Sequence, residues 1–576
     1  MKTKTYFLLF ILVTALSSCT NTENQEQKLN QPNILWIMAE DLSPHLGCYG
    51  DSLVYTPNID KIASEGIVFT KAFTCAGVCA PSRAGIITGM YSTTIGTQHM
   101  RQAGGVIALE GFPKYNAAPE PNIKAFPEYL RAAGYYTCNN RKTDYQFGEP
   151  FTIWDDCSKS AHWRNRPKDK PFFACFTFES SHEINVWPDE VKENFYAKKN
   201  INPHNLVYDV VNRPPLPKKG IVKPEDIVLP PYLPDTKTVR EDFARLLSNV
   251  SRMDQQVAKL LKELEEDELT ENTVIFFMAD HGNCFPRAKR WVYDSGTLTP
   301  LVIKDPTGKL GIGYDSSLVS FTDLAPTVLN MAGVHPPEHM QGKDIFGELK
   351  ENPHQYVFMS RDRMDNRYDM IRAVRSDKFR YIKNYNPETH YTQEIEFMYE
   401  MPAMQSILDE ESKGNLNNTQ SYWLFNSKPE EEFYDLSKDP HEIKNLIDNK
   451  NLQEEIEKHR TALADFQKKY GDWGFMDEYE QAEIMWPGGK QPQTEKPKID
   501  INKETGVVTI NCSTEGASIG YKIMNVWEET DWQLYTKEII INSPCLLIAK
   551  AVRYGWKESE ESTTIINEDF FCKIKQ

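Results

Sequence analysis

The sequence of 576 residues lacks the features that mark several common protein classes. It has no excess of positive charge, because 65 Lys and Arg stand against 82 Asp and Glu, for a formal net charge of −17. A broad cationic face and general nucleic-acid binding are therefore not expected. The eleven cysteines form no CxxC pair and no zinc-like spacing. No long internal repeat is present, and beyond the N-terminal segment no apolar run approaches transmembrane length. Because the net charge is negative, any anionic substrate must be held by local cations.

The N-terminal segment reads as an export signal. Lys2 and Lys4 precede an apolar run over 6–13, which leads into Leu16-Ser17-Ser18-Cys19. The last four residues resemble a bacterial lipobox, in which the cysteine is lipidated. We therefore expect a lipoprotein signal peptide over 1–19, lipid on Cys19 and a flexible tether over 20–31. The protein would then be an exported bacterial lipoprotein, periplasmic or on the cell surface, attached to the membrane only through that lipid.

The remaining chain alternates strand-like and helix-like patterns. Continuous apolar runs over 33–38, 171–178 and 273–278 are typical of buried parallel strands, and 240–265 has the periodicity of a long amphipathic helix. This alternation predicts an α/β fold with a mixed, mostly parallel central sheet covered by helices on both faces.

The expected organisation has four parts after the tether. Residues 32–355 form the large α/β domain, and 356–485 form a smaller α+β subdomain. A linker rich in Pro and Gly covers 486–498. Short strand-like segments separated by turn signals then predict a small β-sandwich over 499–576.

The segment Cys79-Ala80-Pro81-Ser82-Arg83 is the most informative short motif. Pro81 suits the first turn of a helix, which places Cys79 at a loop-to-helix junction where backbone N–H groups favour anions. Arg83 lies one turn further on and directs a cation to the same place. Taken alone, the motif is equally consistent with an ordinary helix start that carries a buried cysteine.

Two polar pairs follow apolar strands directly. Glu40-Asp41 comes after 33–38, and Asp280-His281 comes after 273–278. Ligands of open α/β sheets bind at the carboxyl ends of strands, so the two pairs can converge on one hard divalent cation, with calcium favoured by oxygen ligands. Either pair alone is equally consistent with a solvated strand end.

Taken together, these motifs resemble the sulfatases of the alkaline phosphatase superfamily. The resemblance rests on Cys-x-Pro-Ser-Arg-x-x-x-x-Thr-Gly from Cys79 onward and on the two polar pairs, and it covers about residues 31–480. It implies that a maturase converts Cys79 to formylglycine, whose hydrated aldehyde attacks sulfate sulfur. It also implies one calcium ion held by Glu40, Asp41, Asp280 and His281. The family usually has Asp-Asp and Asp-Asn, so Glu40 and His281 are departures.

The same resemblance implies residues that hold the sulfate. Lys142 matches the family lysine at the end of a third strand, although Asp144 replaces the family histidine. His182 matches a sulfate-facing histidine, and Lys289 matches a lysine four residues before a tyrosine. Cations there would stabilise transition-state charge, with His182 or Lys289 as proton donor. Weaker candidates for substrate binding are Asp144, His99, Arg287, Arg290, Asp365 and Arg367.

Several further segments are similar to N-sulfoglucosamine sulfohydrolases, the heparan sulfamidases. These segments are 229–236, 239–240, 251–257, 432–435 and 439–442. Lys289 stands where that group has Arg, which leaves O-desulfation open beside N-desulfation. The resemblance implies a sulfated oligo- or polysaccharide substrate, such as the glycosaminoglycans heparin and heparan sulfate. The C-terminal sandwich resembles a small domain of some secreted hexosaminidases, from which no function follows.

Two other functions are considered. A phosphatase or phosphotransferase of the same superfamily would share the metal-bearing strand ends, but it would normally use Thr or Ser in place of Cys79. An inactive glycan-binding lipoprotein built on a decayed sulfatase would be expected to lose Cys79 or the acidic ligands, and this sequence keeps them.

Overall fold

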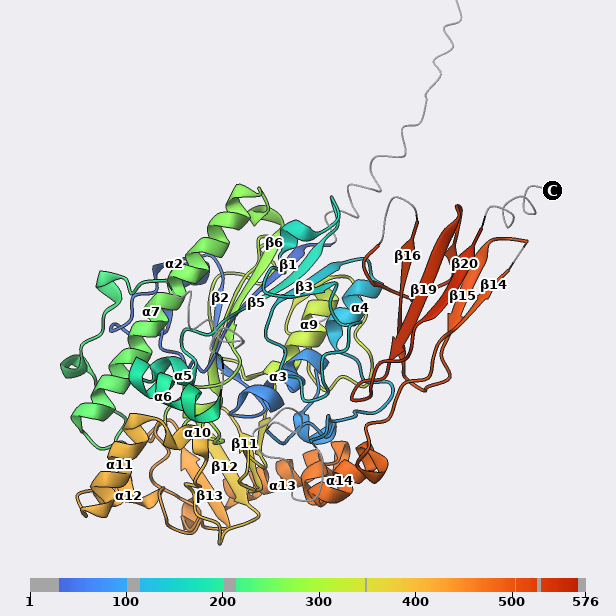
Figure 1. The fold of residues 1–576 in the computed structure, drawn as a ribbon. Coiled ribbons are helices and arrows are strands. Elements are labelled where there is room, and N and C mark those ends of the chain that lie inside the picture. The colour runs from blue at the N-terminus through green and yellow to red at the C-terminus, as the bar shows by residue number, and fades with distance from the viewer. Residues whose placement is uncertain are drawn as a thin grey trace, which may run out of the picture.

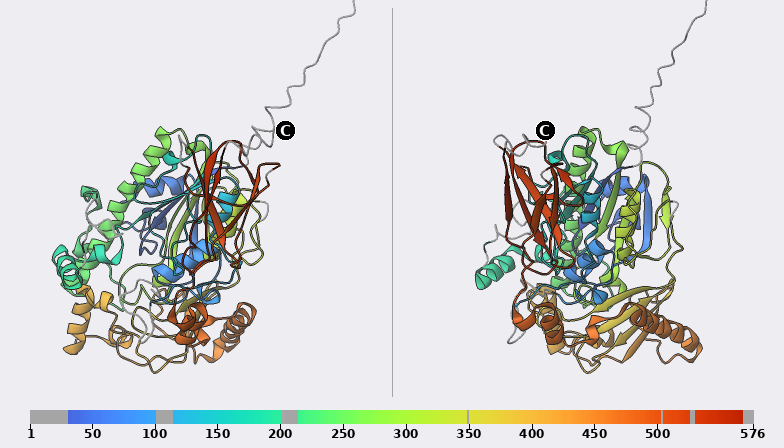
Figure 2. Two further views of the ribbon diagram at one scale, coloured as in Figure 1. Left: turned by 45° about the vertical axis from the view of Figure 1, so that its right-hand side comes forward. Right: turned by 90° about the vertical axis from the view of Figure 1, so that its right-hand side faces the viewer.

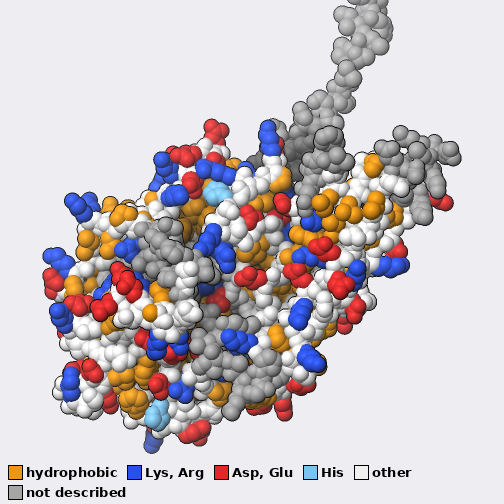
Figure 3. All heavy atoms as spheres, viewed as in Figure 1, with side chains coloured by type: hydrophobic (Ala, Val, Ile, Leu, Met, Phe, Trp, Pro, Cys, Tyr) orange, Lys and Arg blue, Asp and Glu red, His pale blue; other side chains and the backbone are white. Residues whose placement is uncertain are grey.

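The computed structural model describes residues 31–100, 114–200, 202, 214–347, 350–502, 504–525 and 530–567 (Figure 1). The predicted signal peptide, the lipidation of Cys19 and the tether up to residue 30 lie outside these residues, as do the last nine residues of the predicted sandwich. Within the described ranges no helix combines the length and apolarity needed to cross a membrane. Acidic and basic side chains are interspersed on the face shown in Figure 3, without a broad basic area.

The centre of the large domain is a nine-stranded sheet. Strand β1 (Asn33–Ala39) lies between β5 (Phe172–Phe178) and β6 (Thr273–Ala279) and is parallel to both. Beyond β5 follow β3 (Tyr136–Asn140) and β4 (Asp156–Cys157), both parallel. Beyond β6 follow β7 (Leu298–Lys304), β2 (Ile67–Phe73), β8 (Gly313–Asp315) and β9 (Val319–Ser320). Among these described strands only β7 runs against the others, which confirms the predicted mixed, mostly parallel sheet.

Side chains on both faces of this sheet are buried. All seven residues of β1 are buried, as its continuous apolar sequence predicts for a central strand. Leu35 and Ile37 pack into one core together with α2 (Pro57–Ser64) and α7 (Lys237–Glu266). Trp36, on the opposite face, packs into a second core with α4 (Phe126–Ala132) and α9 (Leu324–Met331). Helices therefore cover both faces, as expected from the alternating pattern.

A smaller antiparallel sheet follows the large domain. It contains, in order, β10 (Val357–Arg361), β11 (Ile371–Arg375), β12 (Phe379–Asn384) and β13 (Glu431–Asp435). Helix α13 (Gln453–Tyr470) covers one face through a shared apolar core. The connection before β13 contains α10 (Glu396–Tyr399), α11 (Pro402–Ser412) and α12 (Asn418–Tyr422), and α14 (Glu478–Met485) follows α13.

The C-terminal part consists of two antiparallel sheets that share a core of residues such as Val508 and Leu547. One sheet contains β14 (Lys498–Ile501), β15 (Val507–Asn511) and β18 (Ile539–Ile540). The other contains β17 (Gln533–Leu534), β16 (Ser518–Met524), β19 (Cys545–Val552) and β20 (Ser562–Ile566). Figure 2 shows this sandwich standing beside the large domain in two views.

The segment that connects α14 to the sandwich is packed, although its composition is that of a loose linker. The indole N–H of Trp486 donates to the carbonyl of Gly555 at 3.1 Å. Trp486 also joins Tyr115 of the large domain in a buried apolar cluster. The Thr494 hydroxyl, also buried, accepts the Arg553 N–H at 2.9 Å. The sandwich is therefore held against the large domain at this point.

Candidate active site

Four polar segments meet at one edge of the central sheet. The neighbouring strands β3, β5, β1 and β6 are all parallel, so their carboxyl ends lie side by side. Lys142 follows β3, His182 follows β5, Glu40-Asp41 follows β1 and Asp280-His281 follows β6. This edge is where ligands bind in open α/β sheets.

The first helical turn after β2 brings Cys79 to that edge. Helix α3 (Cys79–Thr88) begins at Cys79 itself, after the extended residue Val78, as the position of Pro81 predicts. The Cys79 Sγ lies 3.2 Å from His281 Nε2 and 3.9 Å from Asp41 Oδ1. The Ser82 hydroxyl donates to the carbonyl of Asp280 at 2.5 Å, which ties the helix start to the end of β6.

A close backbone approach at Gly77 fixes the loop before Cys79. The carbonyl of Gly77 accepts the N–H of Arg290 at 2.6 Å. A Cβ at residue 77 would lie 2.2 Å from the carbonyl oxygen of Trp291, so no larger residue fits without movement of one backbone. The loop that carries Cys79 and the loop that carries Lys289 are therefore placed against each other by direct main-chain contact.

Glu40 is held between two cations. Its carboxylate accepts from the Arg83 guanidinium through one oxygen and from the Lys142 ammonium through the other, and all three side chains are buried. Burial raises the pKa of Glu40 more than Arg83 lowers it. Arg83 also donates through Nε to Asp280 Oδ2 at 3.2 Å. Burial opposes the charge of Arg83, but Glu40 and Asp280 outweigh it and raise its pKa.

Asp41 has polar neighbours in three directions, and two of them donate to it. Its Oδ2 accepts from Lys289 Nζ at 2.6 Å and from the backbone N–H of Glu183 at 2.8 Å, while its Oδ1 lies 3.0 Å from His281 Nε2. Burial alone would raise the pKa of Asp41, but Lys289, His182 and His281 together hold it well below its ordinary value. Asp41 is therefore a buried carboxylate kept ionised by the cations around it.

The donor set around His281 fits a divalent cation. Its Nδ1 donates to the carbonyl of Gly282 at 2.9 Å, so in the neutral ring Nε2 carries a lone pair. That nitrogen faces Asp41 Oδ1 at 3.0 Å and Asp280 Oδ1 at 3.8 Å. Three lone-pair atoms that converge in a buried place require a cation between them or a proton on the ring.

The potential ligand atoms form two overlapping groups within 4.8 Å: Glu40, Asp41, Cys79 and His182, and Cys79, Asp280 and His281. Carboxylate oxygens suit calcium, whereas an imidazole nitrogen is more usual around transition metals. The donor set is thus compatible with one divalent ion, for which His281 would be an unusual ligand.

Glu183 is a site residue that the sequence analysis missed. Its carboxylate accepts both terminal N–H groups of Arg290, at 3.2 and 2.9 Å, and lies 3.4 Å from Lys289 Nζ. Its own N–H donates to Asp41, so Glu183 links Arg290 and Lys289 to the carboxyl end of β1. The only signal in the sequence is an acidic residue directly after His182.

Three of the weaker candidates lie near this cluster. The Asp144 carboxylate is 3.9 Å from Lys142 Nζ. Arg290 is bound by Glu183 as described. Asp365 is close enough for its charge to raise the pKa of Arg290, after the larger effects of burial and Glu183. These three positions are therefore compatible with a place beside a bound substrate.

Arg287 and His99 have structural partners. The Arg287 guanidinium donates to the carbonyls of His441 at 3.0 Å and Glu442 at 2.5 Å, and it stacks over the ring of Tyr293 with its centre 4.2 Å from the ring centroid. His99 Nδ1 accepts the N–H of Arg363 at 3.3 Å. Burial lowers the pKa of His99 to about 4, so the ring is neutral near pH 7.

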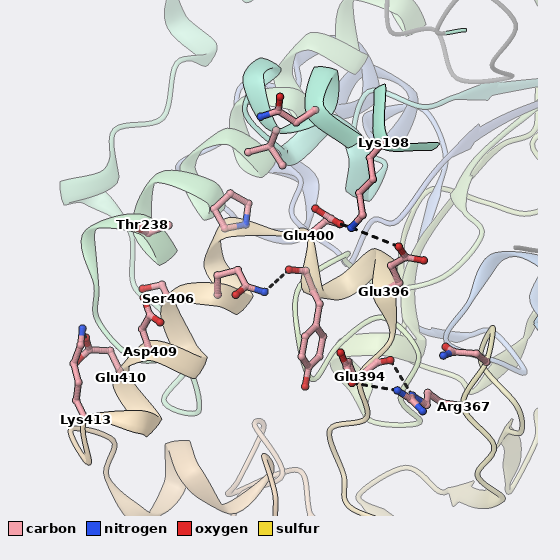
Figure 4. Close-up of a pocket in the computed structure, with 16 residues that line it drawn as sticks. Lys198, Thr238, Arg367, Glu394, Glu396, Glu400, Ser406, Asp409, Glu410 and Lys413 are labelled. Atoms are coloured by element: carbon pink, nitrogen blue, oxygen red, sulfur yellow. Dashed lines mark hydrogen bonds and ion pairs between the residues drawn. The ribbon is translucent and has the colours of Figure 1, made fainter. Parts of the chain in front are cut away.

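Arg367 lines a separate open cavity of about 900 Å³. Figure 4 shows its guanidinium turned toward Glu394, with which it forms an ion pair at 3.3 Å. Much of the cavity wall comes from α6 (Asp189–Lys199), α10 and α11, and its charges are largely paired, such as Lys198 with Glu400 at 2.8 Å. Arg367 therefore already forms an ion pair with Glu394 in this cavity.

Comparisons with known proteins agree with this geometry. The family model described as sulfatase matches residues 32–160 and 158–334, and the model for the C-terminal part of N-sulphoglucosamine sulphohydrolase matches 282–422. The chain is 38% identical to an ulvan-active sulfatase of Formosa agariphila, over 96% of each protein. It is 26% identical to human N-sulphoglucosamine sulphohydrolase, over 76% of this chain and 89% of the human protein.

A solved structure shares the fold. A protein determined in complex with its substrate D-glucosamine-2-N,6-O-disulfate superposes with a TM-score of 0.52 at 19% identity, over 76% of this chain and 98% of that protein. Because the sulfatase model matches more than half of the chain and a relative at 38% identity matches nearly all of it, this protein belongs to the sulfatases, the sulfuric ester hydrolases built on the alkaline phosphatase-like fold.

Proposed function

We propose that this sulfatase removes sulfate from a sulfated polysaccharide by using formylglycine derived from Cys79 together with one divalent cation, calcium. The observation that carries the proposal is the position of the Cys79 Sγ at the first residue of α3, 3.2 Å from His281 Nε2. Around it lie three buried carboxylates and the cations Arg83, Lys142 and Lys289.

The nucleophile is made after translation. A formylglycine-generating maturase, which supplies the oxidant, converts the Cys79 side chain to an aldehyde. Water adds to this aldehyde to give two hydroxyl groups on one carbon, and one of their oxygens takes the place that Sγ occupies here. The helix N–H groups and Arg83 favour negative charge at this position.

Glu40, Asp41, Asp280 and His281 would hold the cation. When bound, it supplies positive charge that polarises the sulfate and favours the ionised hydroxyl. The ion pairs of Asp41 with Lys289, and of Glu40 with Arg83 and Lys142, keep these cations at the same edge of the sheet. They can therefore contact the equatorial sulfate oxygens, whose charge they stabilise.

In the first step a hydroxyl oxygen attacks sulfur and the bond from sulfur to the sugar oxygen breaks. The leaving oxygen takes a proton, and His182 is suited to donate it. Its Nδ1 accepts the N–H of Ile184 at 3.3 Å, so Nε2 is the nitrogen that can exchange a proton with the substrate. Lys289 is the second candidate for this role.

In the second step the remaining hydroxyl group gives its proton to the residue that protonated the leaving oxygen, and the aldehyde re-forms as the bond from carbon to the sulfate oxygen breaks. The net change is hydrolysis of one sulfate ester by one water molecule. A serine at residue 79 could not complete this step, because it has no second hydroxyl to expel the sulfate. This chemistry is the reason why the proposal requires conversion of Cys79.

We propose two substrate classes, the better supported one first. The relative at 38% identity, which matches 96% of this chain, is named for activity on ulvan, and this supports ulvan as the first class. The match of residues 282–422 to the C-terminal model of N-sulphoglucosamine sulphohydrolase supports heparin or heparan sulfate as the second, including N-desulfation. We further propose export as a lipoprotein through Cys19, which would place the enzyme where polymeric substrates arrive.

The proposal is tested by co-expressing the chain with a maturase and analysing the peptide that contains residue 79 by mass spectrometry. We expect the mass of formylglycine or its hydrate, together with sulfate release from ulvan or heparan sulfate oligosaccharides measured by ion chromatography. Cys79→Ala should fold equally well and release no sulfate. Full activity with unmodified cysteine would refute the mechanism, and hydrolysis of phosphate esters alone would refute the substrate.

A further inference from the structure

The C-terminal sandwich enters the core of the large domain through one side chain. Tyr554, in the turn after β19, is fully buried and belongs to the same apolar core as Trp36 of β1. Its hydroxyl donates to Glu128 Oε2 at 2.7 Å and accepts the backbone N–H of Ala125 at 3.3 Å, both at the start of α4. Figure 1 and Figure 2 show the sandwich beside α4.

The same turn holds the loop that follows Lys142. The ring of Tyr554 stacks on Phe147, with centroids 5.0 Å apart and planes 20° apart, and the N–H of Gly555 donates to the Phe147 carbonyl at 3.1 Å. Phe147 stacks in turn on Tyr145, with centroids 5.6 Å apart. A continuous stack therefore runs from the sandwich to within three residues of Lys142.

The loop over 142–148 has a backbone that needs external support. Asp144 and Gln146 have φ values of 57° and 66°, a region that side-chain-bearing residues rarely adopt and that persists only where surrounding contacts fix it. The contacts are present: the Gln146 carbonyl accepts the N–H of Ala117 at 2.9 Å, and the Lys142 carbonyl accepts from Arg83 at 3.5 Å.

The sandwich docks on the large domain through polar contacts as well as apolar ones. Arg131 on α4 donates to the carbonyl of Trp532 at 2.7 Å, and Arg553 donates to the carbonyl of Pro119. Ser518 donates to the other oxygen of Glu128. A Cβ on Gly555 would lie 2.2 Å from the carbonyl oxygen of Ala117, which shows how closely the two backbones approach. Contacts of this kind fix one relative position of the two parts.

We propose that the C-terminal sandwich is a clamp that fixes the loop carrying Lys142, with Tyr554 and Gly555 as positioning residues. The clamp acts through Phe147 and Tyr145, and it keeps the Lys142 ammonium on Glu40 in the site. Both family models that match this chain end before residue 423, so the clamp is an addition to the part that they describe. The ordering of the 142–148 loop by the sandwich does not depend on the proposed function. The expected effect of the clamp on the kinetics rests on that function.

The test uses the full chain with Tyr554→Leu, which removes the stack and the hydroxyl, and Gly555→Ala, which separates the backbones. Hydrogen–deuterium exchange is followed in peptides that cover 142–148 and, to check that the sandwich remains folded, in β15 and β19. We expect exchange in 142–148 to become at least tenfold faster in both variants while β15 and β19 stay protected. Ile565→Ala, at a side chain 79% exposed on β20, is the matched control and should change neither.

The kinetic readout is kcat/KM for sulfate release, normalised to the formylglycine content at residue 79. We expect a decrease of about tenfold in both variants, with the larger change in KM if Lys142 contacts the sulfate in the ground state. Unchanged exchange in 142–148 would overturn the clamp. Faster exchange with unchanged kcat/KM would overturn its effect on the site, whereas an inactive, fully converted wild-type enzyme would instead refute the proposed function.

Discussion

The carboxylate of Glu183 accepts both terminal N–H groups of Arg290, at 3.2 and 2.9 Å, just after the carboxyl end of β5. The same carboxylate is 3.4 Å from Lys289 Nζ. Lys289 therefore has two carboxylate partners, Asp41 and Glu183. If Asp41 binds a metal ion, Glu183 still holds the ammonium group at the site. Glu183 is therefore placed to hold Lys289 and Arg290 at this edge whether or not Asp41 binds a cation.

Glu183→Gln should reduce both stability and activity. Loss of one partner from a buried ion pair leaves uncompensated charge, so we expect the free energy of unfolding to fall by about 3 kcal/mol. We also expect kcat/KM to fall about tenfold, because removing a group that positions Lys289 costs transition-state stabilisation worth about 1.4 kcal/mol. Urea denaturation and steady-state kinetics measure the two effects.

The matched control for that variant is Glu266→Gln. Glu266 pairs with Lys262 at 3.4 Å, one turn away on α7, and both side chains are more than half exposed. Exposed pairs of this kind contribute about 0–1 kcal/mol, so both measurements should remain near the wild-type values. Equal behaviour of the two variants would contradict the assigned role of Glu183.

His281→Ala should remove the metal ion. The ring contributes the nitrogen that faces Asp41 and Asp280, and its loss would leave a gap in the proposed ligand set. Loss of a metal ligand should lower the metal content of purified protein well below one ion per chain, as measured by inductively coupled plasma mass spectrometry, and reduce kcat at least about 100-fold. His281→Asn, which supplies an amide oxygen, should keep the ion and much of the activity. Wild-type metal content in His281→Ala would show that His281 is not a ligand.

The fold and the edge that bears the site follow from local sequence. The apolar runs of β1, β5 and β6 have the length of strands and lie far apart in the sequence, which indicates buried parallel strands. Such strands place their carboxyl ends together. Glu40-Asp41 and Asp280-His281 could therefore be expected to meet, although 239 residues separate Asp41 from Asp280.

The partners of individual charges could not be predicted in the same way. Arg287 stays a predicted substrate-binding residue, and its guanidinium binds the carbonyl of His441, 154 residues further along the chain. No local pattern specifies such a contact. Glu183 was missed because one acidic residue after a histidine is as common on a surface as in a buried ion pair. The contacts of Tyr554 are equally hard to predict from the sequence, because its partners Glu128 and Phe147 belong to another domain.

Gly77→Ala should displace the nucleophile relative to Lys289. A Cβ would lie 2.2 Å from the Trp291 carbonyl oxygen, so one of the two loops must move. We expect a loss of about 2 kcal/mol in stability from overpacking. The accompanying displacement should lower kcat/KM about 100-fold, the typical effect of a misplacement near 1 Å. Rates must be divided by the formylglycine content determined by mass spectrometry.

Gly414→Ala is the control for this substitution. Gly414 has a φ of 69° but no atom within 4 Å of an added Cβ, so only backbone strain, about 1 kcal/mol, should result. Its kcat/KM should equal that of the wild type. If Gly77→Ala also leaves kcat/KM unchanged, the close approach of the two loops does not position the nucleophile.

Asp254→Asn should change how stability depends on pH. The Asp254 carboxylate accepts the N–H groups of Asn58 and Ile59, at 3.1 and 2.9 Å, and so caps α2 from α7. Burial raises the pKa of Asp254 from 3.8 to about 6, and the charge of Asp60 adds a smaller effect in the same direction. The folded protein therefore binds this proton more tightly than the unfolded chain does.

The sign of the effect follows from proton linkage. Between pH 4 and pH 6 the folded state holds more protons, so the contribution of Asp254 to stability is largest at low pH and decreases as the pH rises through about 6. The total decrease should be about 3 kcal/mol for a shift of about two pKa units. Asparagine does not titrate, so the difference in unfolding free energy between wild type and Asp254→Asn should move in favour of the variant by about 2 kcal/mol between pH 4.5 and pH 7.5, because the rest of the decrease falls below pH 4.5. Urea denaturation of both proteins at pH 4.5 and pH 7.5 measures it, and a difference that is constant with pH would show that Asp254 is already ionised in the folded protein at the lower pH.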